Sequence, residues 1–298
     1  MSEWVYPRGS APEGSWELSV GAAGSAVTVD GWAHTGIKVA QTTGGQLLTL
    51  PAAAEERLIV PLAGAFTVHI VDGERFGLRG RRDVFSGPTD VAYVTPGAAV
   101  EITSIGEGRV AVATAPATTG APSQVVRAED VPVSVRGTGM CTREIRNFGM
   151  PGVVEAEKFL VCEVITPAGN WSSYPPHKHD EITDTENSLE EIYYFETRTE
   201  PGAPEGAGAP IGYARVYSTD EQRPIDITEE VRAGDLILVP HGWHGPAAAA
   251  PGYDMYYLNV MAGPGTREWL VTVDPHHVWV PEAIAGLPAD PRLPLEAH

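Results

Sequence analysis

Three histidines and a glutamate in the second half of the chain have the types and spacing of a metal site. His177 and His179 are one residue apart, so on a strand both side chains point to the same side. Glu191 opens a later apolar run, and His244 follows the run DLILVP (235–240). Imidazoles with one carboxylate suit zinc, iron, manganese or nickel. We expect these four residues to hold one divalent metal ion, with zinc as the first candidate.

Two nearby residues compete with members of this ligand set. Glu190 and Glu191 point to opposite faces of a strand, and both faces are apolar, so the pattern alone does not choose between them. His241 lies in the same turn as His244 and is its rival. A lone His-x-His pair is about as often a surface or core pair as a ligand pair. The added glutamate and the Pro-x-Gly-x-His turn at 240–244 favour a metal site.

The elements that must position these residues are short strands. Runs rich in Val, Ile, Tyr and Phe recur between Gly, Pro and Asp turns, and they predict an all-β sandwich or barrel. The runs are 57–62, 65–71, 90–95, 99–103, 109–115, 158–166, 190–197, 213–219, 235–240, 254–261 and 269–274. Helical periodicity is scarce.

The strands fall into two similar halves. Residues 115–126 (APATTGAPSQVV) have the small residues and prolines of a linker. Residues 62–70 weakly echo 189–197, and 94–102 echo 239–246, so we predict a tandem repeat of one β unit. The predicted units are 1–125, without a metal site, and 126–280, with the metal site. A Pro-rich tail follows at 281–298, and the loop 197–210 is expected to be exposed.

Composition narrows the possible partners. The net charge is −19, from 39 acidic and 20 basic residues, which disfavours binding to nucleic acid or to an anionic membrane. The two cysteines are too few for a disulfide framework. The start MSEWVYPRGS does not resemble a signal peptide, and no run is long enough to span a bilayer. We expect a cytoplasmic protein that acts on a small molecule.

The metal-site residues resemble the two motifs of the cupin family. The first motif is His-x-His, a spacer and a glutamate, here His177, His179 and Glu191. The second runs from Gly234-Asp235 through the 240–244 turn, with Asn259 downstream. The first spacer is longer than in the family, and the Pro-Gly-His spacing is one residue shorter. Because the cupin glutamate is followed directly by an apolar strand, the resemblance favours Glu191 over Glu190.

The match narrows to one enzyme family. The segments 170–180, 189–195, 215–218, 234–244 and 250–264 resemble the 5-deoxy-glucuronate isomerase family of myo-inositol breakdown, which is related to 4-deoxy-5-keto-uronate isomerase. This resemblance implies two tandem cupin barrels (double-stranded β-helices, or jelly rolls) with one metal site in the C-terminal barrel. The N-terminal half has only His34 and His69 and no His-x-His. A homo-oligomer is also expected, because exposed barrel edges tend to be covered.

The family reaction is an aldose–ketose isomerisation that converts 5-deoxy-glucuronate to 2-deoxy-5-keto-gluconate. A divalent metal would stabilise the negative charge of an enediolate-like intermediate as a Lewis acid. Tyr213, Arg215 and Tyr217 alternate along one strand. If their face lines the barrel, Arg215 can hold the substrate carboxylate and the tyrosines can donate to its hydroxyls. The alternative is that all three face solvent or pack at the rim.

A general base must move a proton between two carbons, and Lys178, Asp180 and Glu190 lie near the ligands in sequence. On a regular strand, Lys178 points away from the two histidines that flank it. Arg143 and Arg146 are second-line candidates to bind the carboxylate, with surface positions as the alternative.

Four further residues complete the candidate site. Trp171, Ser172 and Ser173 directly precede the first ligands and could shape the entrance, or Trp171 could simply pack. Asn259 could orient a ligand or serve structural hydrogen bonding.

Three other functions stay open at this point. The related keto-uronate could be the substrate, which only an assay separates from the inositol-derived one. A metal-dependent cupin dioxygenase would consume oxygen, whereas an isomerase would not. A non-catalytic sugar-binding cupin would bind its ligand without turnover.

Overall fold

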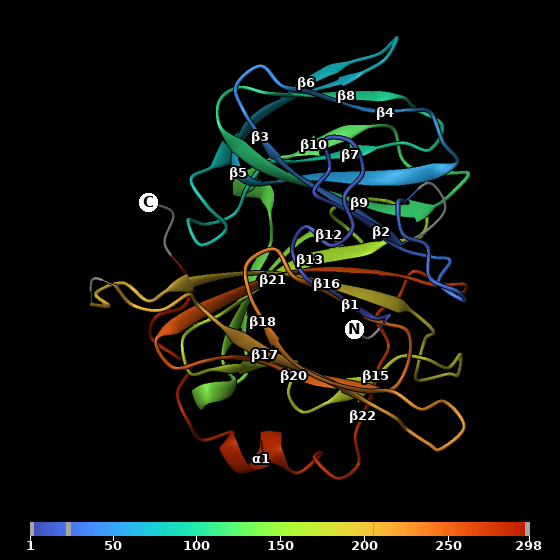
Figure 1. The fold of residues 1–298 in the computed structure, drawn as a ribbon. Coiled ribbons are helices and arrows are strands. Elements are labelled where there is room, and N and C mark those ends of the chain that lie inside the picture. The colour runs from blue at the N-terminus through green and yellow to red at the C-terminus, as the bar shows by residue number, and fades with distance from the viewer. Residues whose placement is uncertain (1–2, 22–24, 205, 296–298) are drawn as a thin grey trace.

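Strands dominate the computed structural model, which describes residues 3–21, 25–204 and 206–295. Every run that the sequence analysis identified as a strand contributes to one. The strands build two β barrels that lie one above the other, the N-terminal one in blue and green and the C-terminal one in yellow and orange (Figure 1). The described part of the chain has no helix long and apolar enough to cross a membrane.

The first barrel is built from one nine-stranded sheet, folded so that a single long strand takes part in two walls. Its strands are β2 (Leu18–Gly21), β3 (Gly36–Thr42), β4 (Leu47–Leu50), β5 (Glu55–Ile70), β6 (Arg75–Arg81), β7 (Val91–Val94), β8 (Val100–Ser104), β9 (Gly108–Pro116) and β10 (Gln124–Val126). Strand β5 unites two predicted runs. It pairs with β7 and β9 through its first half and with β6 and β8 through its second, and the register shifts between Pro61 and Ala63. Such a bulge lets one strand bend from one wall to the other.

The second barrel has two sheets. The seven-stranded sheet runs in the order β1 (Val5–Tyr6), β19 (Leu236–Val239), β16 (Glu190–Thr199), β21 (Tyr253–Ala262), β13 (Leu160–Thr166), β12 (Arg143–Gly149) and β11 (Val133–Arg136). The six-stranded sheet holds β18 (Asp226–Val231), β17 (Gly212–Tyr217), β20 (Trp243–Ala249), β15 (His177–Lys178) and β22 (Thr272–Val273), with β14 (Trp171–Ser172) beside β20. Strand β1 thus joins the second barrel, although the predicted division assigns its residues to the first.

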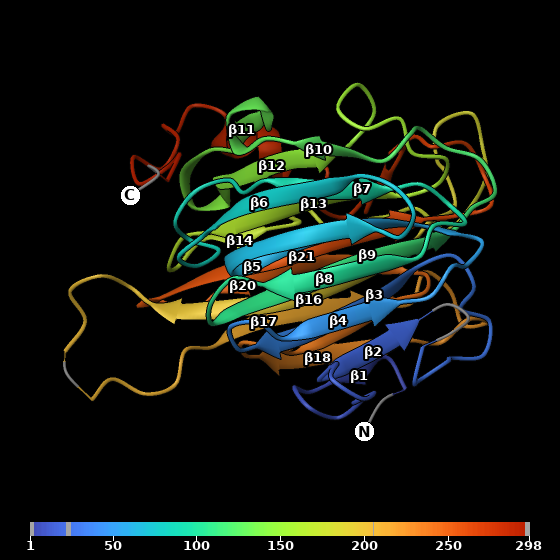
Figure 2. The ribbon, with the colours of Figure 1, turned by 90° about the horizontal axis from the view of Figure 1, so that it is seen from above.

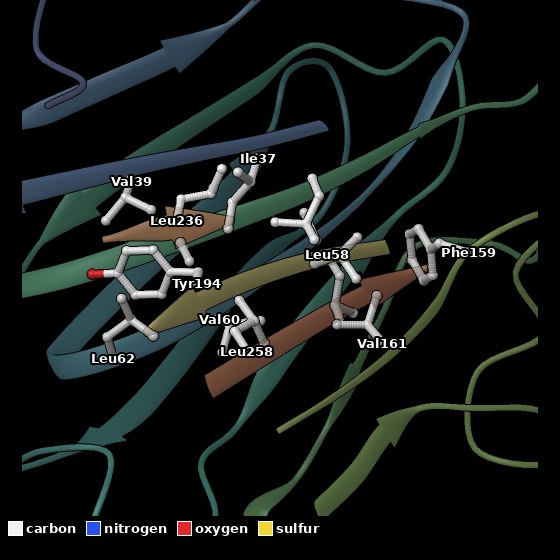
Figure 3. Packing of buried hydrophobic residues seen from close by; sticks show 14 of the residues in the cluster. Ile37, Val39, Leu58, Val60, Leu62, Phe159, Val161, Tyr194, Leu236 and Leu258 are labelled. Atoms are coloured by element: carbon white, nitrogen blue, oxygen red, sulfur yellow. The ribbon is translucent and has the colours of Figure 1, made fainter. Parts of the chain in front are cut away.

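The two barrels share a continuous hydrophobic core. Figure 3 shows side chains from both barrels packed against one another, with Ile37, Val39, Leu58, Val60 and Leu62 from the first and Phe159, Val161, Tyr194, Leu236 and Leu258 from the second. Separate apolar clusters fill the interior of each barrel. Burial of this much apolar surface between the units holds them as one body.

The chain ends against the second barrel. The short helix α1 (Val280–Ile284) lies below that barrel in Figure 1. The Thr138 hydroxyl donates to the Ile284 carbonyl, and the Leu295 amide donates to the Glu144 carboxylate at 2.6 Å. The predicted tail at 281–298 is therefore tied to the barrel through its described residues, to 295.

Seen from above, the strands of the two barrels run at a small angle to one another (Figure 2).

Candidate metal centre

The four predicted ligands meet inside the second barrel. His177 on β15 and His244 on β20 are direct cross-strand partners, and their ring centroids lie 4.4 Å apart. The His179 ring lies 4.6 Å from that of His244. Potential ligand atoms of the three histidines all lie within 4.8 Å of one another. From β16, Oε2 of Glu191 approaches to 3.0 Å from Nε2 of both His179 and His244.

Hydrogen bonds at the far side of two rings orient them toward this centre. Nδ1 of His179 donates to the Leu189 carbonyl at 3.0 Å, and Nδ1 of His244 donates to the Gly242 carbonyl at 3.1 Å. Because a carbonyl can only accept, Nδ1 carries the proton and Nε2 is the atom with a free lone pair in the neutral ring. Nε2 of His244 is buried and makes no well-aligned hydrogen bond, although Oε2 of Glu191 lies 3.0 Å away. A buried nitrogen of this kind fits a metal ligand.

The charges around the centre also suit a cation. Burial and the neighbouring His244 hold the pKa of His177 well below its usual range, so this ring is neutral at pH 7 and offers a lone pair. Burial alone would raise the pKa of the Glu191 carboxyl, but His244 and His179 outweigh burial and hold it well below its usual range. The centre therefore combines three imidazoles with one carboxylate, a donor set that fits a divalent ion.

The two adjacent glutamates have different surroundings. Glu191 accepts a hydrogen bond of 2.5 Å from Nδ2 of Asn259, which fixes the carboxylate from behind. Glu190 points to the first barrel, where its carboxylate accepts from the amides of Ala33, His34 and Thr35 at 2.6–3.0 Å. The alternation along β16 thus brings Glu191, and not Glu190, to the histidines.

A cavity of about 340 Å³ opens beside the centre. One wall is the inner face of the seven-stranded sheet, and Ser173, His177 and Trp269 close it from the other side. The Trp269 ring lies 6.0 Å from that of His177 and is half exposed, so it stands at the rim. The sheet contributes Ser134, Arg136, Arg143, Ile145, Asn147, Cys162, Val164, Glu191, Tyr257, Asn259 and Met261, and Met150 completes the lining. The lining thus mixes polar and apolar side chains, as small-molecule sites do.

The structure does not bring Tyr213, Arg215 and Tyr217 to the cavity. These three side chains share a face of β17 as expected, but Ala214 and Val216 between them occupy the barrel interior. Arg215 is engaged on the outer face by Asp226 and by the carbonyl of Ile227. The expectation that this face lines the barrel is corrected accordingly, because the small apolar residues are the ones that the core accepts.

Lys178 and Asp180 also point away from the ligands. Nζ of Lys178 lies 2.8 Å from Asp180 and 2.7 Å from Glu186, as the strand alternation predicts. The other carboxylate oxygen of Asp180 accepts from the amide of Gly242 and from Arg223, both at 3.0 Å. This saturated network pins the 240–244 turn in place. The structure therefore gives both residues a structural position and none at the cavity.

The remaining candidates divide between cavity and scaffold. Ser173 lines the cavity at a positive φ of 49°, and its hydroxyl lies 3.1 Å from that of Tyr193 and 3.2 Å from that of Tyr257. Ser172 is buried and donates to the Ala247 carbonyl, whereas Trp171 packs edge-on against Tyr174 outside the lining.

The two second-line arginines separate as well. Arg143 lies in the cavity, whereas Arg146 is fully buried against Glu144 and Glu163. Among the polar and aromatic lining residues, sequence reasoning missed five: Ser134, Arg136, Asn147, Tyr257 and Trp269. The alternation in 133–136 and 143–149 was a usable signal for the first three, but only the pairing of β11 with β12 shows which face is inner.

Comparison with known proteins places the chain among sugar-acid isomerases. The profile of the KduI/IolB family matches residues 10–280. A 5-deoxy-glucuronate isomerase of Geobacillus thermodenitrificans is 39% identical over 255 residues, which cover 85% of this chain and 88% of that protein. The 5-deoxy-glucuronate isomerase of Bacillus subtilis strain 168 is 38% identical over 82% of this chain and 87% of its own length.

Solved structures agree with this assignment. An IolB-like protein from Salmonella typhimurium LT2 superimposes with a TM-score of 0.80 at 32% identity, covering 93% of this chain and 98% of its own. Oxalate decarboxylase from Lactobacillus farciminis superimposes with a TM-score of 0.61 at 13% identity, covering 97% of both chains. The second likeness concerns the fold alone. Together the comparisons confirm the resemblance and the cupin fold that the motifs predicted.

Proposed function

Since the chain belongs to the KduI/IolB family, we propose that it is an isomerase that converts 5-deoxy-glucuronate to 2-deoxy-5-keto-gluconate. The observation that carries this conclusion is the 39% identity to a 5-deoxy-glucuronate isomerase over 85% of the chain. The family also includes KduI, so the related keto-uronate isomerisation is the alternative to be assayed. The relatives described above favour the first substrate, because both are 5-deoxy-glucuronate isomerases.

The proposal assigns one divalent ion, with zinc as the first candidate, to His177, His179, Glu191 and His244. It is supported by the clustering of the three histidines and by the buried Nε2 of His244, which makes no well-aligned hydrogen bond and lies 3.0 Å from the Glu191 carboxylate. A bound divalent ion would act as a Lewis acid and stabilise negative charge on a substrate oxygen. Asn259 holds the Glu191 carboxylate in position through its amide.

The residues around the centre prepare the cavity for a polyhydroxy substrate. Burial raises the pKa of Tyr257 to about 12, so its hydroxyl stays protonated at neutral pH and can donate a hydrogen bond. The Ser173 hydroxyl is hydrogen-bonded to those of Tyr193 and Tyr257, which helps to fix their directions. Such preorganised donors act where charge develops on the substrate.

The deciding experiment is an isomerase assay on the purified protein with 5-deoxy-glucuronate. Turnover should vanish on chelation and return when divalent metal is added. His244→Ala should remove metal and activity together. His241→Ala is the matched control, because His241 lies in the same turn but outside the histidine cluster. Full activity of a metal-depleted His244→Ala protein, or oxygen uptake in place of isomerisation, would overturn the proposal.

The proposal also places the enzyme in the cytoplasm as a homo-oligomer. The two cysteines, Cys141 and Cys162, are both free and buried, which agrees with a reducing compartment. Light scattering of the purified protein measures the subunit number directly. A monomer at micromolar protein concentration would contradict the proposed homo-oligomer.

A further inference from the structure

Two arginines face each other across neighbouring strands beside the cavity. Arg136 on β11 and Arg143 on β12 are direct cross-strand partners in the antiparallel register. Side chains in such a pair have Cβ atoms about 5 Å apart, and like charges there destabilise a sheet. In the described part of the chain neither arginine makes an ion pair. The hydrogen bond recorded for Arg143 is a long one, 3.3 Å, from Nη1 to the Cys141 carbonyl.

This lack of carboxylate partners is unusual within this protein. The chain has 39 acidic residues against 20 basic ones, so acidic partners are abundant. Arg146, three residues after Arg143 and on the opposite face of β12, is paired with both Glu144 and Glu163. On the cavity side of the same strands, the neighbours are instead Ser134 and Asn147, which are neutral donors and acceptors. The two guanidinium groups are thus available to an anion from outside the chain.

The arginines and the metal centre open on the same cavity. Arg136, Arg143 and Glu191 all line it. The register carries Glu144 across Ile165 and Tyr256 to Glu196, so Arg143, one residue before Glu144, lies three strands across and six residues along the sheet from Glu191. The two residues therefore line opposite ends of the cavity. Both side chains point inward from a curved wall, which shortens the gap between their ends. Tyr257 and Asn259 line the wall between these two ends, opposite Phe195 and Tyr193 of β16.

We propose that Arg143, with Arg136 beside it, binds the carboxylate of a hexuronate-type substrate and so directs its other end to the histidine cluster. This inference rests on the proposed function and names the residues that select a sugar acid over a neutral sugar. An arginine fork matches a carboxylate with two parallel hydrogen bonds. The bound carboxylate also neutralises the repulsion between the two guanidinium groups.

The test measures binding separately from catalysis. Calorimetric titration of the metal-loaded protein compares D-glucuronate with D-glucose, which lacks the carboxylate. The wild type should bind the uronate more tightly. Arg143→Met should weaken uronate binding about 10- to 100-fold, the range for loss of a charged hydrogen-bonding partner, and leave glucose binding unchanged. Arg143→Lys should lose most of the same binding because it lacks the fork.

Two further variants make the result specific. Arg136→Ala changes an exposed strand end and should weaken uronate binding without loss of folding. Arg215→Ala is the matched control, because it removes an arginine from the outer face of the same barrel. In the isomerase assay Arg143→Met should raise KM for 5-deoxy-glucuronate, with metal content unchanged.

The possible outcomes separate the two proposals. Unchanged uronate binding in both Arg143→Met and Arg136→Ala would overturn the carboxylate subsite, even if isomerase activity is present. Equal affinity of the wild type for glucuronate and glucose would overturn it as well. Uronate binding that depends on Arg143, in a protein without isomerase turnover, would support the subsite and count against the proposed reaction.

Discussion

Replacing each of the two adjacent glutamates on β16 should give opposite phenotypes. Glu190→Ala should destabilise the fold and leave the metal in place, whereas Glu191→Ala should abolish metal binding. The reason is that strand alternation sends Glu190 to the first barrel and Glu191 to the histidine cluster. The comparison also decides which glutamate is a ligand.

The magnitude for Glu190 follows from its contacts. Its carboxylate accepts amide hydrogen bonds from Ala33, His34 and Thr35, and the Thr35 hydroxyl lies 3.3 Å away. Truncation would leave these donors without a partner at a buried junction, and each unsatisfied donor costs roughly 1–3 kcal/mol. Water reaches the less buried amides in part, so we expect a total loss of about 3–5 kcal/mol.

The effect of Glu191→Ala is measured as the loss of the stabilisation that bound metal gives to the folded protein. A ligand that binds only the folded state at 100 times its Kd adds about 2.7 kcal/mol to the free energy of unfolding. The wild type should gain roughly this much when metal is added, and Glu191→Ala should gain none. Glu190→Ala should retain the same gain on a lower baseline.

Denaturant unfolding with and without added metal, together with the metal content of each variant, provides the assay. Glu190→Gln is a milder companion, because it keeps one acceptor oxygen and should cost less than Glu190→Ala. Metal loss in Glu190→Ala with unchanged stability, together with full metal content in Glu191→Ala, would refute the assignment of the two faces of β16.

Three other perturbations test the remaining assignments. Arg215→Ala should leave kcat/KM unchanged and cost at most about 1 kcal/mol, since its ion pair with Asp226 is on the surface; a rise in KM measured by steady-state kinetics would return it to the site. Burial alone would raise the pKa of the Glu163 carboxyl, but the neighbouring Arg81 and Arg146 outweigh burial and hold this pKa below its usual range. The ionised Glu163 therefore stabilises the fold at neutral pH, and this stabilisation is lost as the pH falls through the lowered pKa. Glu163→Gln should therefore cost about 3–5 kcal/mol at pH 7 and progressively less below about pH 4, as followed by unfolding at several pH values; a pH-independent difference would count against the ion pair. Chelation should lower the Tm of the wild type and leave that of His244→Ala unchanged in thermal scans, and an equal decrease in both would contradict the proposed ligand.

The strands were predictable because their signal is local. Alternating or continuous apolar runs between Gly, Pro and Asp turns mark many of the strands, including β5, β9, β13, β16 and β21. The seven-residue strands β3, β6, β12 and β20 match none of the predicted runs. The pairing of Val5–Tyr6 with β19 was not predictable, since it joins residues more than two hundred positions apart. The fusion of 57–62 with 65–71 into β5 also escaped prediction, because Pro61 and Gly64 normally end a strand and here accompany register shifts.

The site was predictable where the residue types themselves carry the chemistry. His177, His179, Glu191 and His244 stand out by type and spacing, and the structure brings them together. A carboxylate-binding arginine has no such signature, because Arg is common on the outer faces of strands. The flanking Tyr213 and Tyr217 make Arg215 resemble a carboxylate-binding residue in the sequence. The small residues Ala214 and Val216 on the other face were the better guide to the barrel interior, because a narrow core accepts them most readily.

The first barrel, whose sequence contains no His-x-His pair, supports the second barrel through contacts at their interface. Three carboxylates cross the interface between the barrels. Glu56 of the first accepts from the amides of Glu157, Lys158 and Phe159, directly before β13. Glu163 on β13 holds Arg81 of the first barrel, and Glu190 on β16 binds the 33–35 segment.

Two of these ties end on the outer faces of β13 and β16, and the third ends directly before β13. The inner faces of both strands contribute to the lining of the cavity. On β13 the bound residue Glu163 lies between Cys162 and Val164, which face the cavity, and on β16 Glu190 directly precedes Glu191. Because neighbours on a strand alternate between its faces, fixing one residue fixes the direction of the next. The first barrel therefore acts as a rigid support that sets the register and the angle of the proposed metal ligand Glu191. Arg81→Met removes the partner of Glu163 and should make the position of Glu191 less well fixed. The metal affinity should therefore fall, although Arg81 does not contact the proposed ligands.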